Sequence, residues 1–185
     1  STHAFGRKTK TAIEQARRRI AQHLGVEPRT ICFTSGGTEA DNMALRASVE
    51  QLGCQRIITC ATEHSAVIKT AEHMASNNGI ALGLLQLNPG GRVDLASLEA
   101  TLSDGIPTIV SVMHGNNEVG IIQDIEAIGQ CCHRHGALFH TDTVQTMGHY
   151  PMDLAALPVD FAACSAHKLH GPKGAGFLYV RDGLR

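Results

Sequence analysis

The chain has 185 residues, 43% of them hydrophobic, and its 16 basic and 17 acidic side chains give a net charge of −1. This length suits one domain with its own core, and the charge gives no electrostatic basis for binding nucleic acid or an anionic membrane. No apolar run is long enough to span a bilayer. The N-terminal stretch 1–5 lacks an apolar signal segment and an initiating methionine, so we expect a cytoplasmic protein that is a fragment or a processed chain.

Helices and strands alternate along the sequence. Apolar residues recur at helical spacing from Ile13 to Leu24, and Gly25 ends that helix. The expected elements that follow are a strand at 30–33, a helix at 38–52, a strand at 56–60, a helix at 66–76, a strand at 80–87, a helix capped by Asp94 and reaching 102, a strand at 108–113, a helix at 125–135, and strands at 137–140, 161–165 and 176–180.

This alternation predicts an α/β fold: a three-layer domain over residues 1–185, with a mostly parallel sheet and helices on both faces. The last strand follows its predecessor after only a short turn. A parallel crossover needs a dozen or more residues, so the last strand is expected to be antiparallel. Ligands of such sheets bind at the carboxyl ends of the strands, and the polar loops there are the candidate sites.

The segment 165–174 contains Lys168 directly after the apolar run 159–164, which is expected to be a buried strand. A buried ammonium is costly unless it is paired or neutralised. One explanation is a Schiff base, because the amine of a desolvated lysine condenses with a carbonyl such as that of pyridoxal phosphate. Ser165 and His167 are then candidates for binding a phosphate. The alternative is a surface lysine in a Gly/Pro turn, and this segment alone does not distinguish the two.

The loop 34–39 follows the first strand and opens a helix. Its glycines and hydroxyls at a helix N-terminus are typical of an anion site. A capping box, with Ser35 or Thr38 as cap and Glu39 or Asp41 assisting, explains the same residues, and the two roles can coexist. The loop is neither a Walker A sequence nor GxGxxG.

Three further loops follow expected strands. His64 either caps the next helix, stacks on a planar ring or shuttles protons. The run 114–120 is a turn or a pair of amides held toward a ligand. Asp142 either caps or pairs with a protonated ring nitrogen, as pyridoxal phosphate chemistry requires.

Six cysteines are present, mostly inside apolar helix or strand patterns, and we expect them to be reduced and buried. In the run 131–135 only Cys131 and His135 share a helical face, which gives two metal ligands at most. No metal site is therefore predicted.

Together the strand-end loops resemble the cysteine desulfurases of the class V aminotransferase branch of fold-type I pyridoxal phosphate enzymes. The sequence of residues 165–174 is most similar to that of the nitrogen-fixation (NifS) type. The resemblance covers nearly the whole chain, and the matching runs are 34–42, 62–64, 116–120, 140–145 and 165–168.

The resemblance implies a role for each matching residue. Lys168 would bond the cofactor and later move the Cα proton of the substrate, and His64 would stack on the ring and assist proton transfer. Asp142 would pair with the pyridine nitrogen and Gln145 would hydrogen-bond the phenolic oxygen. Asn117 would contact both the cofactor and the substrate carboxylate. The phosphate of the cofactor would be bound by Gly37, Thr38, Ser165 and His167.

The chain departs from the family in two ways. Thr143 stands where a small residue is usual after the aspartate, which we expect to be tolerated. The family's nucleophilic cysteine and its substrate-carboxylate arginine lie in a C-terminal region beyond Arg185. The chain is therefore expected to be the large cofactor domain, without the C-terminal small domain and unable to complete sulfur transfer alone.

The resemblance thus implies a cysteine desulfurase that converts L-cysteine to alanine and an enzyme persulfide for iron–sulfur cluster assembly. It also implies a homodimer and an iron–sulfur scaffold or other sulfur acceptor as partners. The alternatives are a selenocysteine lyase or related class V enzyme, and a non-catalytic truncated module that binds the cofactor. A nucleotide-binding Rossmann domain is disfavoured because no GxGxxG follows the first strand.

Overall fold

A computed structural model describes residues 4–184 of the chain. Ser1, Thr2 and His3, which belong to the N-terminal stretch that lacks a signal segment, and Arg185 lie outside the described residues. Seven strands form one sheet in the order β1-β9-β8-β7-β4-β2-β3. Their bounds are β1 Ile31–Thr34, β2 Arg56–Thr59, β3 Ala81–Leu84, β4 Thr108–Ser111, β7 Leu138–Asp142, β8 Phe161–Ser165 and β9 Gly176–Val180.

The sheet is parallel apart from its last strand. The β3, β2, β4, β7 and β8 strands pair in parallel with their neighbours, whereas β9 pairs antiparallel with both β8 and β1. The expected direction of the last strand is confirmed. Because β1 and β8 are both antiparallel to β9, β1 runs in the same direction as the five strands that pair in parallel. These six strands therefore end at one edge of the sheet, and the loops after them face the same region.

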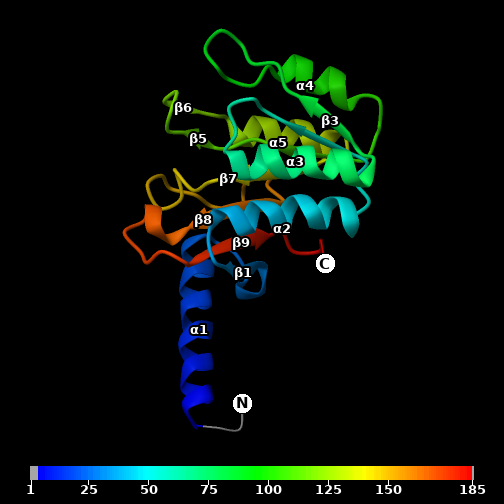
Figure 1. The fold of residues 1–185 in the computed structure, drawn as a ribbon. Coiled ribbons are helices and arrows are strands. Elements are labelled where there is room, and N and C mark those ends of the chain that lie inside the picture. Colours follow the sequence, from blue (N-terminus) through cyan, green and yellow to red (C-terminus); the bar gives the residue numbers. More distant parts are fainter. Residues whose placement is uncertain (1–3, 185) are drawn as a thin grey trace.

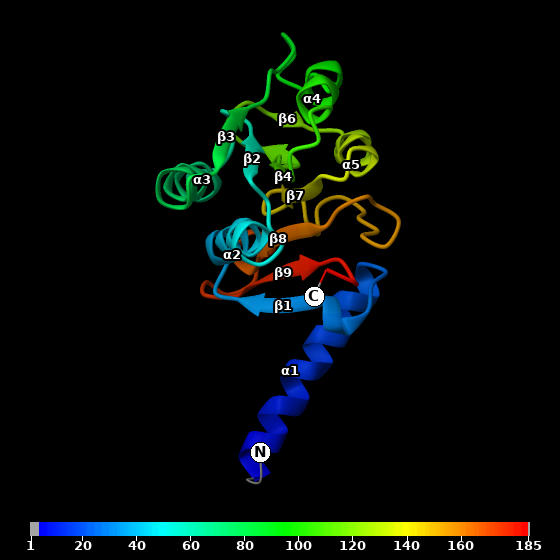
Figure 2. The ribbon, with the colours of Figure 1, turned by 90° about the vertical axis from the view of Figure 1, so that its right-hand side faces the viewer.

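Helices cover both faces of the sheet (Figures 1 and 2). On one face α2 and α3 pack through Leu45 and Met74 against sheet residues such as Ile109. On the other face the end of α1 and the helices α4 and α5 pack on a second apolar cluster that includes Leu98 and Phe139. The helix bounds are α1 Ala4–His23, α2 Gly37–Glu50, α3 Ser65–Asn78, α4 Leu95–Leu102 and α5 Ile125–Arg134. The predicted three-layer α/β architecture is confirmed.

The first helix extends away from the body of the domain (Figures 1 and 2). Its last turn is anchored by Ala21, which is fully buried in the core. Its outer part carries Phe5 and Ile13, which are 87% and 45% exposed. The helix starts earlier than its apolar spacing predicted. Within residues 4–184, no helix is long and apolar enough to cross a membrane.

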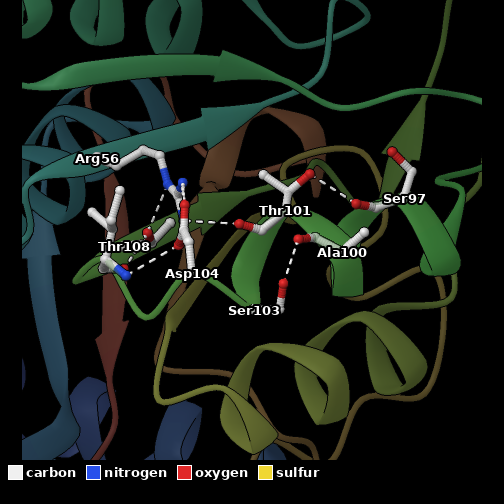
Figure 3. A network of polar contacts seen from close by, with 8 residues as sticks. Arg56, Ser97, Ala100, Thr101, Ser103, Asp104 and Thr108 are labelled. Atoms are coloured by element: carbon white, nitrogen blue, oxygen red, sulfur yellow. Dashed lines mark hydrogen bonds and ion pairs between the residues drawn. The ribbon is translucent and has the colours of Figure 1, made fainter.

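Arg56 lies at the centre of a polar network that joins the starts of β2 and β4 to the end of α4 (Figure 3). Its guanidinium donates to the two carboxylate oxygens of Asp104 at 2.6 and 2.9 Å. It also donates to the Thr108 hydroxyl at 3.0 Å and to the Thr101 carbonyl at 3.2 Å. The Arg56 side chain is only 9% exposed, so its charge depends on these partners.

Arg56→Met is expected to lower the free energy of unfolding by about 1–3 kcal/mol, because it removes the hydrogen bonds of a buried guanidinium, among them the one to the buried Thr108 hydroxyl. Arg56→Lys should recover only part of this loss, since one ammonium does not reproduce the forked geometry. The control is Arg46→Met, whose pair with Glu50 at 3.7 Å is exposed and contributes little. Urea unfolding of the three variants tests this, and equal losses at positions 46 and 56 would contradict it.

Candidate functional site

A cavity of about 360 Å³ opens at the carboxyl ends of the parallel strands. It is formed by the N-terminus of α2 and by the loops that follow β2, β4, β7 and β8. All nine residues that the sequence nominated lie in its wall: Gly37, Thr38, His64, Asn117, Asp142, Gln145, Ser165, His167 and Lys168. The fold therefore brings together residues that are separated by up to 131 positions in sequence, from 37 to 168.

Lys168 lies at the rim of this cavity and is exposed. Of the two positions that the sequence left open for Lys168, buried or at the surface, the structure shows the surface position. The apolar strand β8 ends at Ser165, and the chain then leaves the sheet in the short 3-10 helix Ala166–Lys168. The amine is thus held beside the cavity without being desolvated by the core of this chain.

One end of the cavity is suited to an anionic group. The α2 helix begins there at Gly37, and its N-cap Gly36 makes no side-chain capping bond, so the first N–H groups of the helix are left to other partners. A Cβ at Gly37 would lie 2.6 Å from Cγ2 of Val144, which explains the glycine. Ser165 Oγ and His167 Nδ1 lie 2.8 Å apart and add polar groups to this end.

The expected capping box is only half present. Neither Ser35 nor Thr38 caps the helix, since Gly36 occupies the N-cap position. Glu39 does reach back, and its Oε2 accepts a hydrogen bond from the Ser35 backbone N–H at 2.6 Å. Hydrogen bonding from the Ser35 side chain, and next from this N–H group, lowers the pKa of Glu39.

Asp142 lies at the other end, on the cavity floor at the end of β7, and is 5% exposed. Its Oδ1 accepts a hydrogen bond from the Val144 N–H at 2.8 Å. Burial, and next the neighbouring carboxylate of Asp41, raise the pKa of Asp142 to about 7. A buried carboxylate in this position is stabilised by a positive charge brought by a ligand.

His64 caps α3, as one of its expected roles predicted. Its Nδ1 accepts the Ala66 N–H at 3.2 Å, so a neutral ring carries its proton on Nε2. Across the cavity, Gln145 Nε2 donates to Asn117 Oδ1 at 3.0 Å and fixes the two amides relative to each other. Both features hold planar polar groups in set orientations around the cavity.

The interpretation of the sequence missed four residues of the cavity wall: Asp41, Met113, Glu118 and Val144. Asp41 is the most informative of them. It is 1% exposed and comes from the face of α2 that also buries Ala44 and Leu45. An acid on the apolar face of a helix is the signal that identifies it, because such a residue is rarely buried without a partner.

The six cysteines are free thiols, and all except the partly buried Cys32 are buried, as expected. Burial raises the pKa of Cys54 to about 11 and of Cys60 and Cys164 to about 12. None of the six belongs to the wall of the cavity. These thiols are therefore unsuited to act as nucleophiles on a ligand there.

Comparisons of the chain with protein families, curated proteins and solved structures all indicate the same family. Residues 1–185 match the family described as aminotransferase class V. The chain is 47% identical over 182 residues to the cysteine desulfurase IscS of Edwardsiella ictaluri (strain 93-146), covering 97% of this chain and 45% of that protein.

Solved structures agree with this result. A NifS-like protein superposes with a TM-score of 0.91 at 39% identity, covering 99% of this chain and 51% of the other. The structure of SspA in complex with cysteine gives a TM-score of 0.91 at 34% identity, covering 98% of this chain and 52% of the other. The chain thus spans about half the length of the relatives it matches.

Proposed function

The chain belongs to the class V aminotransferase family, and on this premise we propose that it is the cofactor-binding part of a cysteine desulfurase that uses pyridoxal phosphate. The observation that carries the proposal is the joint placement in one cavity of an amine, Lys168, a buried carboxylate, Asp142, and an anion-binding helix terminus at Gly37. The similarity to proteins named cysteine desulfurase supports the reaction.

The donor set fits this cofactor. Its phosphate would be held by the α2 terminus with Thr38, Ser165 and His167, and its ring nitrogen by Asp142. When bound, pyridoxal phosphate supplies an aldehyde that condenses with amines and a ring that withdraws electrons from the bonds at the substrate α-carbon.

The chain's own residues would bond the cofactor, move the substrate proton and orient the reacting groups. Lys168 provides the amine that bonds the cofactor, and as a base it moves the proton at the substrate α-carbon. His64, whose neutral ring carries its proton on Nε2, would lie against the cofactor ring and assist that transfer. Gln145 and Asn117 act as one hydrogen-bonded unit that orients the phenolic oxygen and the substrate carboxylate.

The proposed substrate is L-cysteine, and the structural neighbour SspA, solved in complex with cysteine, supports this choice. In the overall reaction the Cβ–S bond of cysteine breaks, its sulfur joins a protein thiol as a persulfide, and the carbon skeleton leaves as alanine. The high pKa values and positions of the chain's own cysteines support a nucleophilic thiol from outside this chain.

We further expect a cytoplasmic homodimer that passes sulfur to an iron–sulfur scaffold or another acceptor. The exposed Phe5 and Ile13 on the projecting helix α1 support self-association, because apolar side chains on such a helix gain stability when covered. The sulfur acceptor rests on the family resemblance alone.

Product analysis tests the proposed function. The intact protein, meaning this chain together with the region that supplies the nucleophilic thiol, is loaded with pyridoxal phosphate. It is expected to convert L-cysteine to equal amounts of alanine and persulfide sulfur. Selenide from selenocysteine without sulfide from cysteine would indicate a selenocysteine lyase instead. Cofactor binding without turnover of either substrate would contradict the desulfurase and favour a non-catalytic module.

A further inference from the structure

A row of buried polar side chains lies beneath the cavity floor. Ser111 on β4 and His140 on β7 are register partners in parallel strands, so their side chains leave the same face of the sheet. His140 and Asp142 are two residues apart on β7 and share that face. Asp41 reaches the row from α2, the helix that covers this face. Four residues from three elements therefore meet at one place.

The contacts within the row leave two of its atoms without a hydrogen bond. Ser111 Oγ and His140 Nδ1 lie 2.8 Å apart. His140 Nε2 and Asp41 Oδ1 lie 3.4 Å apart, which is an ion-pair distance, but among the described residues neither atom has a partner in hydrogen-bond geometry. All three residues are at most 1% exposed. Burying polar atoms without hydrogen-bond partners costs free energy of folding, so the retention of these two atoms in the interior needs an explanation.

Asp41 and Asp142 both line the cavity, so its floor carries two carboxylates. Like charges at a buried site each increase the affinity of the other for a proton or another cation. Asp41 raises the pKa of Asp142 and His140 lowers it. The other titratable groups around Asp142 are Glu63, Cys164 and, in the cavity wall, His64, Glu118, His167 and Lys168.

We propose that Asp41 is a positioning residue that acts through Asp142: held against His140, it makes the cavity floor a two-carboxylate site for a cationic ring nitrogen. This inference rests on the proposed function, because the cation is the protonated ring of the bound cofactor. Asp41 strengthens the retention of that proton, and His140, which lies 3.4 Å from Asp41, moderates the effect.

The test uses 4-deoxypyridoxine 5′-phosphate, which lacks the aldehyde and so binds without a bond to Lys168. In the intact protein, Asp41→Asn is expected to weaken binding of this probe about tenfold, and to lower the pH at which the bound ring loses its proton. His140→Gln is expected to raise that pH. Ser48→Ala is the matched control, because Ser48 is a buried, uncharged residue on the same helix whose hydroxyl donates to the Ala44 carbonyl.

The absorbance of the bound ring during a pH titration provides the readout, after circular dichroism has shown which variants are folded. Opposite shifts in Asp41→Asn and His140→Gln, with none in Ser48→Ala, are the predicted result, since a purely structural role does not give opposite signs. If Asp41→Asn does not fold, the sign in His140→Gln decides. Unchanged midpoints in folded variants overturn this inference alone, whereas failure of the unmodified protein to bind the probe overturns the proposed function.

Discussion

Lys168→Ala is expected to lower the rate of alanine formation from L-cysteine at least about a thousandfold, because it removes both the amine that bonds the cofactor and the base at the substrate α-carbon. The fold should be unaffected, since the Lys168 side chain is exposed and follows the end of β8. Steady-state turnover of the intact protein, with circular dichroism as the test of folding, measures both effects.

Lys69→Ala is the control for this variant. Lys69 is a lysine on α3, near His64 in sequence but outside the wall of the candidate cavity. Its removal should leave turnover within about twofold of the unmodified protein. Similar losses in the two variants, or retained turnover in Lys168→Ala, would contradict the role assigned to Lys168.

Asp142→Asn is expected to abolish activity and yet to stabilise the protein without its cofactor. The unfolded chain ionises Asp142 near the usual pKa of 3.8, whereas the folded chain does so at about 7. Between these values the folded state binds more protons than the unfolded state. The contribution of Asp142 to the free energy of unfolding therefore falls as the pH rises through this window and is constant above it.

The asparagine has no such dependence and keeps an acceptor for the Val144 N–H. Above about pH 7 the cofactor-free variant should be more stable than the unmodified protein by about 2–4 kcal/mol, with a smaller difference near pH 4. Urea unfolding of both proteins at the two pH values tests this. A variant that is less stable than the unmodified protein at the higher pH would show that the ionised carboxylate of Asp142 does not lower the free energy of unfolding.

Much of the fold follows from local patterns in the sequence. Alternating helices and strands predicted the three layers, and the short turn between Lys168 and Gly176 predicted the antiparallel direction of β9. The position of β9 between β8 and β1 was not predictable in this way, because strand order depends on pairing between distant segments. The short hairpin of β5 Gly115–Asn116 and β6 Ile121–Ile122 was missed, since two-residue strands show no alternation.

The candidate site was likewise predicted only in part from the sequence. Its nine nominated residues share one cavity because parallel strands end at one edge of the sheet. The sequence left open whether Lys168 is buried or exposed, and the burial of Asp41 was not predicted. Both depend on where the backbone turns after a strand, and on which face a helix presents to the sheet. Asp41 was interpreted as part of a helix cap, a local role that its sequence neighbours also satisfy.

The most direct test of the account is to locate the cofactor bond. The intact protein, supplied with pyridoxal phosphate, is reduced with borohydride, digested and examined by mass spectrometry. A single phosphopyridoxyl group on the peptide that contains Lys168, retained in Lys69→Ala, is the predicted result. An adduct distributed over several exposed lysines, or no adduct at saturating cofactor, would contradict the assignment of this cavity as a pyridoxal phosphate site.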